Sequence, residues 1–190
     1  MASLATPRVQ LVDVDNYPRA ALSAALPRHA NFPRAGITFV DVLPLFASPS
    51  LRAAALDALA AAARALPTPP TCVAGFEARG FLLIGVAERL GLPFVCLRKK
   101  GKLPGALTSV DYALEYGEAT LQAAEGALPR GAAVLLVDDL LATGGTARAG
   151  AALVAAAGAT VAALAVLVDI TACGGAAACG APAVLSLLSV

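Results

Sequence analysis

Residues 134–146 of the chain read VLLVDDLLATGGT, and this stretch says most about the fold. Its apolar beginning belongs to the run AAVLLV at residues 132–137, which lacks the polar alternation of a half-exposed strand. Such runs are typical of a strand covered on both faces of a parallel sheet. Two acids, Asp138 and Asp139, come next, and a polar turn then opens a helix; the turn consists of Ala142, Thr143, Gly144, Gly145 and Thr146.

The polar turn has the composition of a phosphate site. Glycines let backbone N–H groups point toward an anion, threonine hydroxyls add donors, and the helix N-terminus adds partial positive charge. The two carboxylates are unsuited to phosphate but can accept hydrogen bonds from a vicinal diol or bind a Mg²⁺ on it. The segment has neither the lysine of a Walker A loop nor the glycine spacing of the dinucleotide fingerprint. It therefore predicts a ribose 5-phosphate site; the structural alternative is a capped helix beside solvated acids.

Apolar and helical segments alternate along the rest of the chain. Further buried strands are predicted at residues 71–75, 93–97, 161–168 and 183–188, and helices at residues 80–90 and 145–157. Ser48 before Pro49 predicts the start of another helix, because serine caps and proline lacks only an N–H that would be unsatisfied. Residues 1–46 carry five prolines and are expected to be irregular apart from a short helix near residues 19–26. The alternation predicts an α/β fold with a central, mostly parallel sheet flanked by helices.

Composition excludes several classes of protein. The chain has 190 residues, 14 basic against 13 acidic side chains and 58% hydrophobic residues. A near-neutral chain is a poor electrostatic partner for nucleic acid, and one this apolar is not intrinsically disordered. Residues 149–168 carry no charge, but Gly158 divides them into a predicted helix and a predicted strand, so we expect no membrane span.

The four cysteines, Cys72, Cys96, Cys173 and Cys179, form no C-x-x-C pair, which argues against a zinc or redox site. Cys72 and Cys96 lie in apolar runs and are expected to be buried. The beginning of the sequence shows no apolar run typical of a signal peptide. These features favour a cytoplasmic protein with reduced thiols.

Three further segments accompany the acids and the turn: GFEARGF at residues 75–81, LRKKGKLPG at residues 97–105 and YALEYG at residues 112–117. Together the four segments resemble the type I phosphoribosyltransferases, and among them the adenine phosphoribosyltransferases. The resemblance implies one domain over residues 1–190 with the fold of that family. It also implies an N-terminal hood over about residues 1–46, which binds the base, and a flexible flap over about residues 98–117.

The activity implied by this resemblance is purine salvage. Such an enzyme transfers the phosphoribosyl group of 5-phosphoribosyl 1-pyrophosphate (PRPP) to adenine and gives AMP and pyrophosphate. Residues 142–146 would then hold the 5′-phosphate, and Asp138 and Asp139 would bind the ribose hydroxyls. The implied cofactor is Mg²⁺, held by the same two acids through water.

The resemblance places the pyrophosphate on two segments. One is the loop with Glu77, Ala78 and Arg79, in which the Glu77–Ala78 peptide bond is hypothesised to be cis. The other is the flap, where Arg98 and Lys102 would reach the pyrophosphate, in part from a neighbouring subunit. The alternatives from the residues alone are a surface arginine at a helix start for Arg79 and a solvated basic loop for the flap.

The resemblance also assigns residues to the proton acceptor and to the binding of the purine. Glu115 would accept the proton that the purine nitrogen loses, and Tyr116 would pack against the sugar or base. Adenine would lie in the hood against Ile37, Thr38, Phe39 and Val40. Phe39 is the stacking candidate, with simple core packing as its alternative. Relatives often carry arginine where this chain has Val40, so an adenine contact there would have to come from the backbone.

The expected partners are small molecules, adenine and PRPP, with no nucleic acid or membrane, and the resemblance favours a homodimer. Three other functions stay open from the residues. The first is transfer to guanine, hypoxanthine or xanthine, which would differ only in the hood. The second is a regulator that senses PRPP, and the third is a nucleotide-binding module without chemistry.

Overall fold

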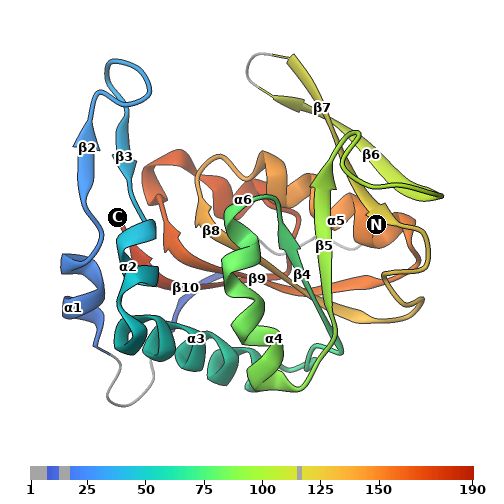
Figure 1. Ribbon diagram of the computed structural model, residues 1–190, viewed down its shortest axis with the longest axis horizontal. Coiled ribbons are helices and arrows are strands. Elements are labelled where there is room, and N and C mark those ends of the chain that lie inside the picture. The colour runs from blue at the N-terminus through green and yellow to red at the C-terminus, as the bar shows by residue number, and fades with distance from the viewer. Residues whose placement is uncertain (1–7, 13–17, 115–116) are drawn as a thin grey trace.

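The computed structural model describes residues 8–12, 18–114 and 117–190. An eight-stranded sheet crosses the molecule in the order β1-β10-β9-β8-β4-β5-β7-β6 (Figure 1). Neighbours are parallel from β1 to β5, and β5, β7 and β6 pair antiparallel. The strands are β1 (Arg8–Leu11), β4 (Cys72–Phe76), β5 (Phe94–Lys99), β6 (Leu107–Leu114), β7 (Gly117–Ala124), β8 (Ala133–Leu141), β9 (Thr160–Asp169) and β10 (Ala183–Ser189). The predicted α/β class and mostly parallel sheet are confirmed.

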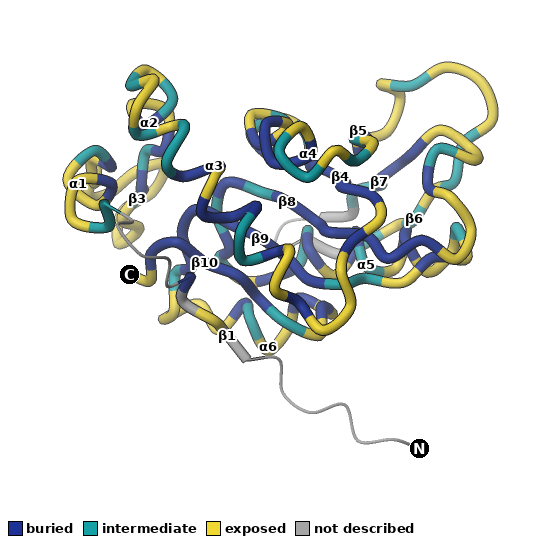
Figure 2. Tube along the Cα trace, turned by 90° about the horizontal axis from the view of Figure 1, so that it is seen from below, coloured by how far each residue is buried: buried dark blue, intermediate teal, exposed yellow. Residues whose placement is uncertain are grey.

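Helices cover both faces of this sheet, and Figure 2 shows the central strands buried between them. The helical elements are α1 (Arg19–Ala24), α2 (Leu43–Ala47), α3 (Pro49–Arg64), η1 (Arg79–Leu83), α4 (Ile84–Leu90), α5 (Gly145–Ala156), η2 (Thr171–Cys173) and α6 (Gly175–Ala178). Successive side chains of a strand point to opposite faces. Leu135 and Val137 of β8 accordingly pack with α3, whereas Val134 and Leu136 pack with α5. This double coverage explains why β8 is continuously apolar.

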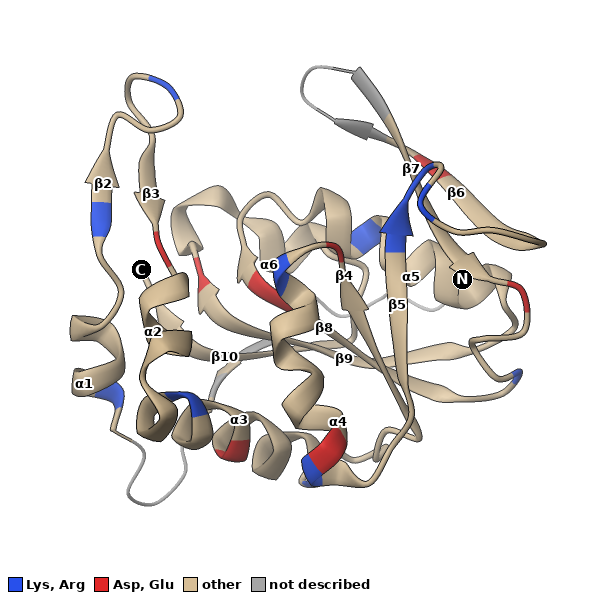
Figure 3. Ribbon diagram, in the orientation of Figure 1, with Lys and Arg blue, Asp and Glu red and all other residues tan. Residues whose placement is uncertain are grey.

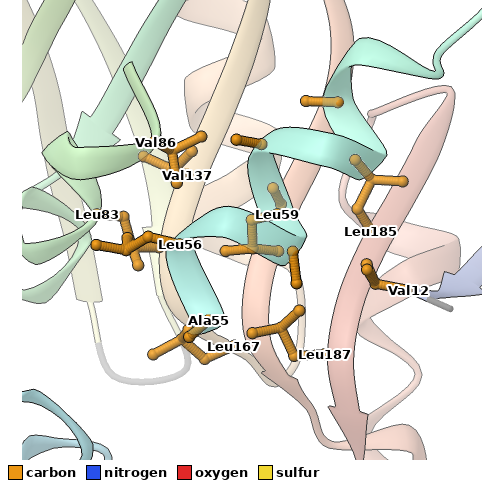
Figure 4. Close-up of a cluster of buried hydrophobic side chains, with 14 of the residues drawn as sticks. Val12, Ala55, Leu56, Leu59, Leu83, Val86, Val137, Leu167, Leu185 and Leu187 are labelled. Carbon is orange, nitrogen blue, oxygen red and sulfur yellow. The ribbon is translucent and has the colours of Figure 1, made fainter. Parts of the chain in front are cut away.

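Helix α3 begins where the sequence predicts. The Ser48 hydroxyl accepts a hydrogen bond from the Leu51 backbone N–H at 3.5 Å, and Pro49 occupies the first turn. Leu56 and Leu59 point from α3 toward the sheet, where they meet side chains such as Val137 and Leu187 (Figure 4). The apolar side of this helix thus forms the core on one face of the sheet.

Several sequence predictions were wrong in detail. The helix expected from residue 80 begins as the 3₁₀ turn η1, and regular helix starts only at Ile84. Residues 1–46 are less irregular than expected: they contain β1 and a separate two-stranded sheet of β2 (Arg28–Ala30) and β3 (Thr38–Val40). Cys96 is exposed rather than buried, because it lies on the opposite face of β5 from the buried Val95 and Leu97.

The predicted division of the long uncharged run into a helix and a strand is confirmed. Residues 149–168 are divided between α5 and β9 by Gly158, which has a left-handed φ of +75°. Within the described ranges, no helix has the length and apolar character needed to cross a bilayer.

A close contact between α5 and β4 brings the phosphate turn up to the sheet. Gly150 of α5 faces Phe76, the last residue of β4, whose ring is buried. A Cβ atom at position 150 would lie 2.4 Å from Cζ of that ring. Only glycine permits this approach, since real Cβ contacts are much longer. Because Phe76 directly precedes Glu77, this contact also positions the loop that follows β4.

Gly150→Ala is expected to lower the free energy of unfolding by about 1–3 kcal/mol, because the new methyl group overpacks the ring of Phe76. Without that collision, helix propensity alone would raise stability by about 0.8–1 kcal/mol. Urea unfolding followed by circular dichroism measures the difference. Adding Phe76→Leu should recover part of the loss, and a Gly150→Ala protein more stable than its parent would contradict the close packing.

Candidate active site

The two acids lie inside β8 rather than after it, because the strand continues to Leu141. Asp138 is half-buried and Asp139 is buried, and the Asp139 N–H donates to Asp138 Oδ1 at 2.9 Å. Burial raises the pKa of Asp138 well above its ordinary value, and the neighbouring Asp139 charge adds to this. Burial also raises the pKa of Asp139, against the opposing charge of Arg79. Two crowded carboxyl groups of this kind are suited to donors such as sugar hydroxyls.

One acid of the pair, Asp138, and the turn border a pocket of about 590 Å³, whose lining does not include Asp139. Asp138 lines it together with the whole predicted phosphate turn, residues 142–146. Gly144 has a left-handed φ of +82° and precedes the first residue of α5, so the helix N-terminus points at this pocket. Behind the turn, a Cβ on Gly144 would lie 2.5 Å from the Gly175 carbonyl oxygen. The structure therefore brings together the residues that the sequence predicts for a sugar phosphate.

The loop after β4 has the expected backbone. The Glu77–Ala78 peptide bond is cis, which confirms that hypothesis. The loop passes close to β8, since a Cβ on Gly80 would lie 2.7 Å from the Val137 carbonyl oxygen. Its backbone therefore runs directly beside the acid pair.

The side chain of Glu77 pairs with the guanidinium group of Arg98. It accepts hydrogen bonds from Arg98 Nε at 2.8 Å and from the Lys99 backbone N–H at 3.0 Å. The hydrogen bond from Arg98 is the main reason why the pKa of Glu77 lies below its ordinary value. This contact joins the loop to the first residues of the flap, and nothing in the sequence pattern pairs these two positions.

Arg79 lies at the centre of the site and not at a detached surface position. Its Nε is 3.1 Å from Asp139 Oδ2. That oxygen has no aligned hydrogen bond within the described residues, so the contact is an ion pair without hydrogen-bond geometry. The guanidinium carbon also lies 5.7 Å from the ring centroid of Phe39 in β3. Figure 3 shows basic and acidic segments side by side where the central strands end.

The flap continues β5 into the hairpin of β6 and β7. Arg98 stands at its base, and Lys102 is exposed in the turn that follows. The Gln122 side chain anchors this turn by accepting the Gly101 N–H at 3.1 Å. Glu115 and Tyr116 lie outside the described residues, so their predicted roles stay predictions.

The four predicted adenine-binding residues of the hood differ in burial. Ile37 and Thr38 are exposed, Phe39 is half-buried, and Val40 packs into the core. The side chain of Val40 is therefore removed from any base pocket, and only its backbone could contact adenine. Phe39 meets Phe32 edge-on at 5.2 Å between ring centroids, and because Phe39 is half-buried and Phe32 is exposed, the pair is not part of the core.

Arg148 is a pocket residue that the sequence analysis did not single out. It lies on the first turns of α5 and lines the same pocket as the phosphate turn. The available signal was its position, because a cation two residues after Thr146 on the helix that opens at a phosphate turn lies close to that turn.

Comparison with known proteins agrees with this geometry. A family model described as phosphoribosyl transferase domain matches residues 46–177. The adenine phosphoribosyltransferase of Parafrankia sp. (strain EAN1pec) is 47% identical over 167 residues, which cover 85% of this chain and 90% of that protein. That of Streptomyces coelicolor is 51% identical over 147 residues, covering 77% and 80%.

Solved structures give the same result. The adenine phosphoribosyltransferase of Thermoanaerobacter pseudethanolicus superposes with a TM-score of 0.86 at 35% identity, over 90% of this chain and 99% of that one. The enzyme of Saccharomyces cerevisiae, solved with an imino-altritol bisphosphate and adenine, gives 0.84 at 35% identity, over 90% and 98%. The chain therefore belongs to the phosphoribosyltransferase family and, within it, to the adenine phosphoribosyltransferases.

Proposed function

We propose that this chain transfers the 5-phosphoribosyl group from PRPP to adenine, giving AMP and pyrophosphate. The single observation that carries the proposal is the pocket in which Asp138 adjoins the turn at residues 142–146. One end offers the Asp138 carboxylate to a diol, and the other offers backbone N–H groups and hydroxyls to a phosphate. A ribose 5-phosphate group has these two features at opposite ends.

The reaction breaks the bond between C1′ and the pyrophosphate oxygen while a purine nitrogen bonds to C1′. Positive charge develops on the ribose and negative charge on the leaving pyrophosphate, so fixed charges around the donor lower the barrier. Arg79 and Arg98 lie on the two segments that flank the cis Glu77–Ala78 bond, where the pyrophosphate would lie. Lys102 and the backbone of that loop complete the proposed pyrophosphate site.

The attacking nitrogen must lose a proton, and we propose that the carboxylate of Glu115 accepts it. A carboxylate near the base can act as a general base in this step. Glu115 follows β6 in the sequence, and β6 belongs to the flap and forms a hairpin with β7. Tyr116 would pack against the sugar or base, and the exposed hood residues Ile37 and Thr38 with Phe39 would enclose adenine.

Asp138 and Asp139 would suit a Mg²⁺ ion whose other ligands come mainly from the substrate. Within the described ranges, no group of three or more His, Cys, Asp or Glu side chains could hold a metal alone. Asp138 and Asp139 offer carboxylate oxygens, the type of ligand that Mg²⁺ prefers, and would bind it through water. When bound, Mg²⁺ supplies positive charge that offsets the charge of the leaving pyrophosphate.

Two further features belong to this proposal. We propose a homodimer. The support is that Arg98 and Lys102 of the flap resemble the flap cations of this family, which in part reach the site of a neighbouring subunit. We also propose a cytoplasmic location, supported by the free thiols of Cys72, Cys96, Cys173 and Cys179. Thiols of this kind persist in reducing compartments.

Incubation with PRPP and one base at a time tests the activity. Adenine should give a nucleotide monophosphate and pyrophosphate, measured by absorbance and by coupled pyrophosphate detection. Guanine, hypoxanthine and xanthine should give rates at background. A faster reaction with one of these three would move the assignment to another purine, and no pyrophosphate release with any base would leave only nucleotide binding.

Glu115→Gln should lower kcat by about 10²–10⁴-fold, because the amide cannot accept the proton of the base. AMP binding, measured by calorimetry, should stay close to the parent value. Glu125→Gln is the matched control, since Glu125 is exposed in the turn after β7. Unchanged turnover of Glu115→Gln would remove the general-base role from this residue.

Removal of divalent ions by a chelator should reduce the rate of AMP formation to background, and added Mg²⁺ should restore it. Asp138→Asn should raise the Mg²⁺ concentration needed for half-maximal rate, because one carboxylate of the pair is lost. The measurement is a Mg²⁺ titration at saturating adenine and PRPP. A variant with the parent's Mg²⁺ dependence would show that Asp138 does not assist the ion.

A further inference from the structure

A side chain of β7, Gln122, holds the turn between β5 and β6. This turn, residues 100–106, is called the flap turn below, and it carries Lys102 of the proposed pyrophosphate site. Strand β7 lies between β5 and β6, and Gln122 is in register with Arg98 on one side and with Ser109 on the other. Gln122 is therefore placed to bond to the segments on both sides of the flap turn.

The amide of Gln122 uses both of its ends. Its Oε1 accepts the Gly101 N–H at 3.1 Å, and its Nε2 donates to the Ser109 hydroxyl at 3.1 Å. A backbone N–H can only donate, so the amide oxygen has to face Gly101 and the amide nitrogen has to face Ser109. The two bonds fix the orientation of the side chain and connect the start of the flap turn to β6.

Gln122 is a buried polar residue in an apolar part of its strand. It is 8% exposed, and its neighbours Leu121 and Ala123 are buried apolar side chains. Burial of an amide costs free energy unless hydrogen bonds replace those that it made with water. An apolar side chain would occupy this position without that cost. The amide is therefore explained by the group that it holds, the Gly101 N–H.

The flap turn brings a cation to the donor site. Lys102 is exposed and makes no ion pair within the described ranges. The pKa of Glu77 is lowered mainly by the hydrogen bond from Arg98, and the charge of Lys102 also lowers it. The ammonium group of Lys102 is thus close enough to act on the loop after β4. Figure 3 shows the basic end of β5, from which the flap turn starts.

We propose that Gln122 is a positioning residue for pyrophosphate, because it fixes the flap turn from which Lys102 meets that group. This inference rests on the proposed function. Gly101 has a left-handed φ of +76°, and glycine has more backbone freedom to lose than any other residue. The bond to Gln122 removes part of that freedom before the substrate arrives, so less ordering of Lys102 is left for the binding step.

Calorimetric titration of the full chain with pyrophosphate, and separately with AMP, tests this role at a constant Mg²⁺ concentration. Gln122→Met should weaken pyrophosphate binding by about two- to tenfold, the effect of one lost hydrogen bond. Methionine has a similar length but cannot accept the Gly101 N–H. AMP should bind as tightly as to the parent, because it carries no pyrophosphate. The KM for PRPP should rise by the same factor as the pyrophosphate dissociation constant, with the KM for adenine unchanged.

Ser109→Ala tests the other end of the connection. Ser109 is exposed, so this change leaves the core intact. Loss of its hydroxyl frees Nε2 of Gln122 and should weaken pyrophosphate binding by a smaller factor than Gln122→Met does. In the double variant it should add nothing, because Ser109 acts through Gln122.

Thr120→Val is the matched control. Thr120 lies two residues before Gln122 in β7, and its hydroxyl donates across the hairpin to Asp111 at 2.6 Å. Only its backbone carbonyl bonds to the flap turn, where it accepts the Lys100 N–H. Valine removes the bond between the side chains and keeps the backbone contact. Thr120→Val should therefore bind pyrophosphate as tightly as the parent.

Three results would overturn the inference: parent affinity for pyrophosphate in Gln122→Met, an equal loss of AMP affinity, or an equal loss in Thr120→Val. If Gln122→Met does not fold, Ser109→Ala decides, and parent affinity for pyrophosphate in that variant rejects the inference. The transfer assay on the parent separates this from the proposed function. AMP formation by the parent, together with parent affinity in Gln122→Met, rejects the positioning role alone. A parent that neither binds pyrophosphate nor forms AMP rejects the proposed function and this inference with it.

Discussion

The site depends on a buried carboxylate, Asp139, that the fold places directly beside another one. Two such groups in one strand end repel each other and lose hydration, so they need opposite charge and hydrogen-bond donors nearby. Arg79 provides the charge at 3.1 Å. It can do so only because the loop after β4 runs against β8, an approach that Gly80 permits. The loop after β4 and strand β8 therefore meet at this carboxylate, which Arg79 pairs by charge.

Local sequence predicted the elements whose signal is local. The unbroken apolar run before Asp138, the glycines of the phosphate turn and the Ser48 cap each specify their own backbone, and each formed as expected. The hood strand at residues 28–30 was missed because all its residues are exposed, so burial left no pattern. The alternation of half-buried Val110 and Tyr112 with exposed Asp111 in β6 was a usable signal that the sequence analysis passed over.

Contacts between distant segments lay beyond prediction from the residues. Nothing in the order of amino acids shows that Glu77 accepts from Arg98, or that Arg79 reaches from Asp139 to Phe39. These pairs arise because β4, β5 and β8 are neighbours in the sheet and their loops meet at one edge. The burial of Val40 likewise depends on the core beneath the hood. Resemblance to a family supplied roles for these residues but not their mutual geometry.

The contact of Gly144 with Gly175 has a consequence for how such a chain can evolve. The two residues approach so closely that a methyl group on either would meet backbone of the other's segment. The shape of the phosphate turn is therefore moulded by a glycine-rich stretch some thirty positions downstream. A side chain added to that remote stretch would therefore displace the backbone that holds the phosphate.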